Sequence, residues 1–189
     1  MGGDDGFVLK LNSSGNILWT KLFGTSQLEF VNGMNVDANG NVYVCGTTPG
    51  TFAGNVNSGG NDIFFVKYDS SGNLLLVKQM GSPMYDYAQG VAFDSGGNTY
   101  LTGGTAGGLD GNTNAGLDDF FLIKLNSSGM NQWTRQLGTP ATDLGKSIAI
   151  DSNGDILMAV DSGGNFGGTV NPGGAASFLL KYNSSGVLQ

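Results

Sequence analysis

The sequence contains no histidine, and this absence removes the commonest general base and the commonest transition-metal ligand of proteins. Only one cysteine is present, Cys45, so no disulfide can form within the chain. Cys45 lies in the run VYVCGTT, whose pattern predicts a strand in which the thiol is a small buried group.

Charged residues are also scarce, at 12% of 189 residues, and the net charge is −7. This balance disfavours nucleic acids and anionic membrane surfaces as partners, because both select for lysine and arginine. No apolar run reaches the length of a membrane span. The start, MGGDDGF, lacks the basic and apolar segments of a secretory signal peptide.

Turn-forming residues are abundant, with 34 glycines and many asparagines, serines and threonines. Between them stand short alternating runs of valine, isoleucine, leucine, phenylalanine and tyrosine. Such a composition is typical of a single all-β domain with a packed core, and not of a helical bundle or a disordered chain.

A repeat of 57 residues organises the whole chain. The segments KLNSSGN, KYDSSGN, KLNSSGM and KYNSSGV begin at positions 10, 67, 124 and 181. We therefore divide the single domain, 1–189, into repeats 1–57, 58–114 and 115–171 and a partial repeat 172–189. Further residues recur in the same register: Phe7, Phe64, Phe121 and Phe178; Gly24, Gly81 and Gly138; Asp37, Asp94 and Asp151.

Each four-strand unit carries four strand signals, as at 33–37, 41–48, 63–69 and 73–80. Turn segments such as Ala38–Gly40 and Ser70–Gly72 separate them and favour tight hairpins. Four antiparallel strands in units of 40–60 residues are the signature of β-propeller blades. The sequence thus predicts an all-β propeller with about three four-stranded blades in the chain.

The repeats resemble the bacterial β-propeller repeat family SBBP, the "seven-bladed β-propeller" type. The residues that carry this resemblance are the D-x-F-x-x-K run from Asp62 to Lys67, the tryptophan strands at Trp19 and Trp133, and the D-x-x-G-N run from Asp37. The resemblance covers the whole chain and implies a repeat module of a bacterial surface or secreted protein, without a shared chemistry.

Three blades of this size form an open arc, because closed propellers have four to eight blades. The ends of such an arc would bear unpaired strand edges and an apolar face. We therefore expect either a piece of a larger ring or a homo-oligomer, most simply a dimer that closes a ring.

The first candidate site is the acidic position just before the first strand of each blade, at Glu29, Asp86 and Asp143. In a closed ring these carboxylates would gather at the mouth and could bind a cation or a polyol. The alternative reading is a turn residue, or a partner of Lys146.

A second candidate is the loop containing Asp110, Asn112 and Asn114, whose spacing is close to that of a calcium loop. The glycine is one place late and no glutamate closes the loop, so the alternative is a structural glycine- and asparagine-rich loop. No other cofactor is expected.

The third candidate is an acid followed five residues later by a lysine, in Asp5 and Lys10, Asp62 and Lys67, and Asp119 and Lys124. A lysine among apolar residues needs a partner if it is buried, so we expect inter-blade ion pairs; a catalytic amine is the alternative.

No catalytic motif is present: the sequence lacks a nucleophile elbow, a P-loop and a metal-spaced cluster of cysteine or histidine. We expect a non-catalytic module that binds protein or glycan or serves as a scaffold. The alternatives are a polysaccharide hydrolase or lyase, and a propeller fragment that has no ligand and self-assembles.

Overall fold

The computed structural model describes residues 2–166, 168–171 and 173–189, and these residues form thirteen strands with one short 3-10 turn. In chain order the elements are β1 Gly6–Leu11, β2 Ile17–Phe23, β3 Phe30–Val36, β4 Val42–Thr48, β5 Asp62–Tyr68, β6 Leu74–Met80, β7 Asp86–Phe93, β8 Thr99–Thr105, η1 Leu109–Gly111, β9 Asp119–Leu125, β10 Asn131–Leu137, β11 Asp143–Ile150, β12 Ile156–Ser162 and β13 Ala176–Tyr182.

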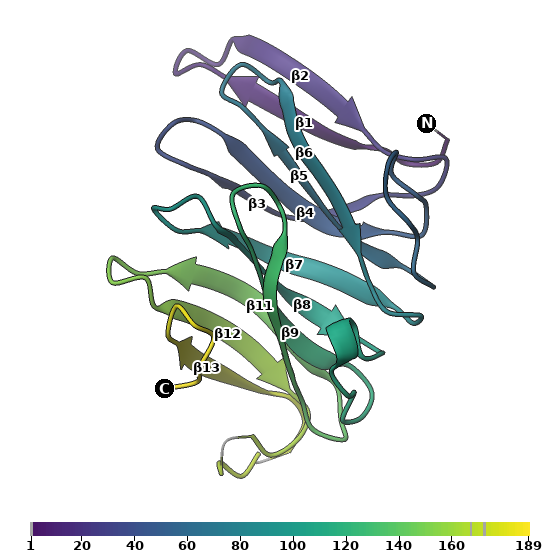
Figure 1. The fold of residues 1–189 in the computed structure, drawn as a ribbon, viewed down its shortest axis with the longest axis vertical. Helices are drawn as coiled ribbons and strands as arrows, with labels where there is room; N and C mark the ends of the chain where they lie inside the picture. Colours follow the sequence, from purple (N-terminus) through teal and green to yellow (C-terminus); the bar gives the residue numbers. More distant parts are fainter. Residues whose placement is uncertain (1, 167, 172) are drawn as a thin grey trace.

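The strands form four antiparallel sheets. Sheet I is β1-β2, sheet II is β3-β4-β5-β6, sheet III is β7-β8-β9-β10, and sheet IV is β11-β12-β13. The sheets follow one another along the long axis of the molecule, from the purple end of the chain to the yellow end (Figure 1). The four-stranded antiparallel unit expected from the sequence is confirmed in sheets II and III.

The sheets are out of phase with the sequence repeats. The repeat boundary at 57/58 falls in the loop between β4 and β5, in the middle of sheet II. Sheets I and IV are accordingly partial, with the last two and the first three strands of the unit. The three-blade estimate thus corresponds to two complete sheets flanked by two partial ones, and this chain by itself forms no closed ring.

Apolar side chains hold the sheets together face to face. One buried cluster lies between sheets I and II and includes Val8 and Phe64; the next, between sheets II and III, includes Phe65 and Phe121. A third, between sheets III and IV, includes Leu122. The middle strands β4, β5, β8 and β9 are buried along almost their entire length, because both of their faces are covered.

The recurrent Ser-Ser-Gly segment is the predicted hairpin turn. In sheet II the Asp69 carboxylate accepts hydrogen bonds from the backbone N–H groups of Ser71 and Asn73, both at 2.8 Å. Gly72 then adopts a φ of +81°, a left-handed conformation that glycine reaches without steric cost. The turn is thus fixed by its own residues, which explains why it recurs with so little change.

Candidate functional site

Glu29, Asp86 and Asp143 do not line an opening, which corrects the ring-mouth prediction. Asp86 and Asp143 are completely buried, and Glu29 is 6% exposed. Each acid accepts hydrogen bonds from a serine or threonine four positions earlier, and these bonds fold the preceding loop over the carboxylate. For Asp86 that residue is Ser82, whose backbone N–H lies 2.6 Å and whose hydroxyl lies 2.9 Å from Oδ2.

A second carboxylate lies beside each of these three acids. It comes from the start of the third strand in the preceding sheet: Asp62 faces Asp86, and both approach the same backbone position, Gly81. The equivalent groups are Asp5 with Glu29 at Gly24, and Asp119 with Asp143 at Gly138. We call these three places the junctions; they join sheets I and II, II and III, and III and IV.

The expected ion pairs between Asp and Lys do not form, because the two residues lie at opposite ends of one strand. Among the described residues, salt bridges are made only by Lys181, with Asp151 and Asp155. The lysines instead reach the next sheet: Lys10 Nζ donates to the Ser70 carbonyl at 2.8 Å and Lys124 Nζ donates to the Ser184 carbonyl at 3.1 Å. These two lysines thus link neighbouring sheets as predicted, but each binds a backbone carbonyl of a turn and not a carboxylate.

Lys67 makes another contact, since its ammonium lies 4.6 Å from the centroid of the Tyr43 ring. This cation–π geometry stabilises the charge of a lysine that is largely removed from water. Lys124 lies in the same way over the equivalent ring, that of Tyr100, at 5.2 Å. No catalytic amine is indicated, because each lysine is occupied in a structural contact.

The loop of Asp110, Asn112 and Asn114 does not bring these three side chains together, contrary to the calcium-loop hypothesis. Asp110 accepts hydrogen bonds from Thr134 and from Asn131 at 2.7 Å. The Asn112 amide donates to the Leu109 carbonyl. The remaining asparagine anchors the loop to β8 through the Thr105 carbonyl. In the part of the chain that the structure describes, no cluster of three or more acidic, histidine or cysteine side chains is placed to bind a metal.

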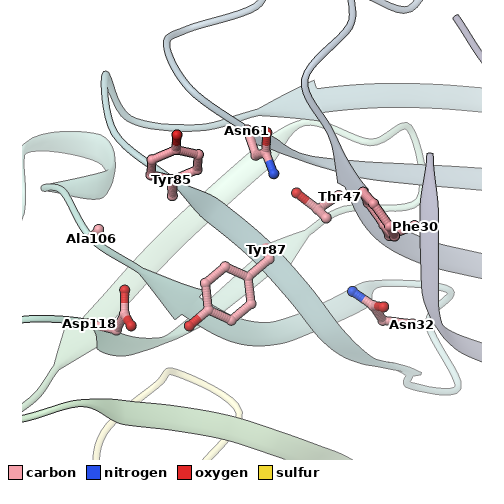
Figure 2. A pocket seen from close by; sticks show the side chains of 8 residues that line it. All are labelled: Phe30, Asn32, Thr47, Asn61, Tyr85, Tyr87, Ala106 and Asp118. Carbon is pink, nitrogen blue, oxygen red and sulfur yellow. The ribbon is translucent and has the colours of Figure 1, made fainter. Parts of the chain in front are cut away.

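A hollow of about 520 Å³ opens between the first strands of sheets II and III. Three aromatic rings and several polar groups line it (Figure 2): Phe30, Asn32, Thr47, Asn61, Tyr85, Tyr87, Ala106 and Asp118. Figure 2 shows the Tyr87 ring between Asp118 on one side and Asn32 and Thr47 on the other. Tyr85 and Phe30 are more than half exposed, so their rings are available to a ligand.

The surroundings of Tyr87 in the hollow keep the phenol of this residue protonated. Burial above all, and then the neighbouring Asp118 carboxylate, raise the pKa of Tyr87 above its ordinary value. The hollow thus combines an uncharged donor, Tyr87, with a single carboxylate and two amides. Such a lining can hydrogen-bond a neutral polar ligand and pack an aromatic face against it.

Sequence reasoning missed this hollow, although a signal for it exists. The equivalents of Tyr85 and Tyr87 in the neighbouring repeats are Leu28 and Phe30 on one side and Thr142 and Leu144 on the other. The two tyrosines therefore break the repeat at one junction only. A departure from an otherwise strict repeat is where a function specific to one blade would be found.

Two regions of the chain, residues 18–52 and 132–167, match the family model described as SBBP, beta-propeller repeat. A curated relative from Acanthamoeba polyphaga mimivirus, named an uncharacterized WD repeat-containing protein, is 25% identical over 213 aligned residues. That alignment covers 92% of this chain but 15% of the viral protein. The bacterial surface origin expected from the sequence stays a prediction.

Among solved structures, a polysaccharide lyase, ulvan lyase, aligns with a TM-score of 0.46 and 14% identity, over 87% of this chain and 42% of the lyase. A gluconolactonase of Xanthomonas campestris aligns with a TM-score of 0.47 and 12% identity, over 95% of this chain and 52% of the lactonase. Likenesses of this degree transfer no activity to this chain. What the matches to the repeat model and the four-stranded sheets together establish is an all-β domain that contains β-propeller repeats.

Proposed function

We propose that this domain is a non-catalytic binding module that takes a segment of carbohydrate in the hollow between sheets II and III. The observation that carries this proposal is the cluster of Phe30, Tyr85 and Tyr87 beside two amides and one carboxylate. Sugar rings offer apolar C–H faces that pack on aromatic rings and hydroxyls that bind amides and carboxylates. The volume of about 520 Å³ is within the range of small-ligand sites, roughly 300–1,000 Å³.

The chemistry of the hollow favours binding over catalysis. Glycoside hydrolysis needs two carboxyl groups on opposite sides of the scissile bond, and Asp118 is the one carboxylate of the lining. A tyrosine base would need a lowered pKa, whereas burial and the Asp118 charge raise the pKa of Tyr87. The other acids of this region, Asp62 and Asp86, are buried and have no access to a substrate.

The test is a glycan array followed by calorimetry with any glycan that binds. Tyr85→Ala removes an exposed ring from the hollow, and we expect roughly a fivefold loss of affinity, since a packed aromatic ring contributes about 1 kcal/mol. The matched control is Leu28→Ala, at the same repeat position outside the hollow. Unchanged affinity of Tyr85→Ala would refute the site, and release of reducing ends from polysaccharide would refute the non-catalytic assignment.

We also propose that copies of the chain associate end to end. On sheet I, Phe7 is 64% exposed, whereas its repeat equivalent Phe64 is completely buried against the neighbouring sheet. On sheet IV, Leu179 is 75% exposed, whereas its equivalent Phe65 is buried. The exposed face of sheet I is equivalent to the faces that pack on a preceding sheet within the chain, and the exposed face of sheet IV is equivalent to those that pack on a following sheet. The two faces are therefore complementary, and a second copy of the chain is the partner that fits them.

A further inference from the structure

We propose that each of the three junctions binds a small hard cation of the calcium type between its two buried carboxylates. The pairs are Asp5 with Glu29, Asp62 with Asp86, and Asp119 with Asp143. These sites are distinct from the hollow and do not depend on carbohydrate binding. Four properties of the junctions support them: buried acids without a salt bridge, hydrogen bonds that occupy the other carboxylate oxygens, unpartnered oxygens, and a glycine at each meeting point.

The first property is the charge of the pair. Asp62, Asp86, Asp119 and Asp143 are all completely buried, and no lysine or arginine of the described chain makes a salt bridge to any of them. Burying a single unpaired carboxylate already costs several kcal/mol, and two adjacent ones repel each other. A stable junction therefore needs a positive charge or a proton.

The second property is the set of hydrogen bonds around the pair. Asp86 accepts bonds from the Ser82 N–H, the Ser82 hydroxyl and the Thr105 hydroxyl. On the other side, Asp62 Oδ2 accepts bonds from the Ser58 N–H at 2.8 Å and from Gln79 Nε2 at 3.0 Å. Three of the four carboxylate oxygens of this pair thus have donors within the protein, and the fourth, Asp62 Oδ1, has none.

The third property is an unfilled acceptor that points into each junction. Oδ1 of Asp5, of Asp62 and of Asp119 is buried without a hydrogen-bond partner, and so is Oδ1 of Asp143. Buried polar oxygens are seldom left unpaired, and an ion absent from a structure is one ordinary reason. The same atom is unpartnered in three successive repeats, so a common cause is indicated.

The fourth property is the glycine at the centre. A Cβ at Gly81 would overlap Asp62 Oδ1 and would lie 3.0 Å from Asp86 Oδ2. The same holds at Gly138, where the added carbon would overlap Asp119 Oδ1 and lie 3.1 Å from Asp143 Oδ2. Glycine thus leaves the space in which both carboxylates converge on one point.

The donor set selects the class of cation. At the junction of Asp62 and Asp86 it consists of oxygens: the two carboxylates and the Ser82 and Thr105 hydroxyls. Calcium accepts six to eight oxygen ligands in flexible geometry, whereas magnesium requires a stricter octahedron and softer metals prefer nitrogen or sulfur.

The experiment measures calcium directly on the intact chain. Protein freed of metal with EDTA is titrated with CaCl2 by calorimetry, with terbium luminescence as a second reading, at pH 7.5 and fixed NaCl. We expect three calcium ions per chain and a melting temperature that rises with calcium. Asp62→Asn, which keeps the size of the side chain, should reduce the number to two; Asp4→Asn, an exposed acid with the same change of charge, should leave it at three.

Gly81→Ala is the second variant, because it fills the space without changing charge and should also reduce the number to two. Binding of no calcium, sodium or magnesium by the unmodified protein would overturn the proposal, even if the variants failed to fold. Equal loss of calcium in Asp4→Asn would show non-specific binding and would overturn it too.

Discussion

The sharpest test of the packing is to truncate the same phenylalanine in two repeats. Phe64→Ala removes a completely buried ring that lies 5.7 Å from the Phe23 ring and 5.4 Å from the Phe52 ring. Burial of a phenylalanine and the cavity left by its loss are together worth about 3–5 kcal/mol, and two aromatic contacts place this site near the upper end. For a chain of this length, about 4 kcal/mol lowers Tm by roughly 10 °C.

Phe7→Ala, at the equivalent position on the bare face of sheet I, should change the stability of the dilute chain by less than about 0.5 kcal/mol. Urea unfolding followed by fluorescence and by circular dichroism gives both free energies, and equal m-values confirm that the unfolded states are comparable. Equal destabilisation by the two substitutions would refute the conclusion that Phe7 lies on an exposed face and Phe64 on a buried one. A loss below about 1 kcal/mol for Phe64→Ala would refute the packing between sheets I and II.

Three further predictions concern association, pH and the links between sheets. Light scattering should show a mass that rises from monomer with concentration, and Phe7→Ala should suppress that rise; a monomer at every concentration would contradict association. Burial tends to raise the pKa of Asp94, but bonds from Asn98, Tyr100 and the backbone outweigh it and lower the pKa. The stability that Asp94 contributes should thus be complete above pH 4 and be lost as the pH falls through the lowered value, and Asp94→Asn should flatten acid unfolding curves, which unchanged curves would disprove. Lys124→Met, which removes the bond to the Ser184 carbonyl, should cost about 1 kcal/mol in urea unfolding, and no loss would disprove the link.

The strands and turns could be predicted from the sequence because they depend on local signals that recur. The apolar run of residues 63–66 and the left-handed Gly72 each fix a conformation within a few residues. Four copies of the same pattern then remove most of the ambiguity that one copy would leave. The bounds were less exact, since the first strand of the unit was expected at 33–37 and β3 spans Phe30–Val36, and the number of sheets that this chain completes followed only from the pairing of the strands.

The wrong site predictions have physical reasons. Residues five apart on a strand are roughly 16 Å apart and point to opposite faces, so Asp62 and Lys67 could not pair. The burial of Asp86 was signalled by Ser82 four residues earlier, a spacing shared by Thr25 with Glu29 and by Thr139 with Asp143. The pairing of Asp62 with Asp86 could not be predicted, because it depends on how one sheet lies on the next.

The identity of successive junctions has a consequence for evolution. Each 57-residue period adds one interface of the same kind, with its own acid pair and glycine, so a duplicated or deleted period would leave its neighbours undisturbed. Where the pattern lapses, as at Ala176 in place of the aspartate, a further sheet would meet a junction with half its charge. Loss of one aspartate by mutation would therefore weaken only the junction at which it lies, and duplication of an intact repeat could restore that junction.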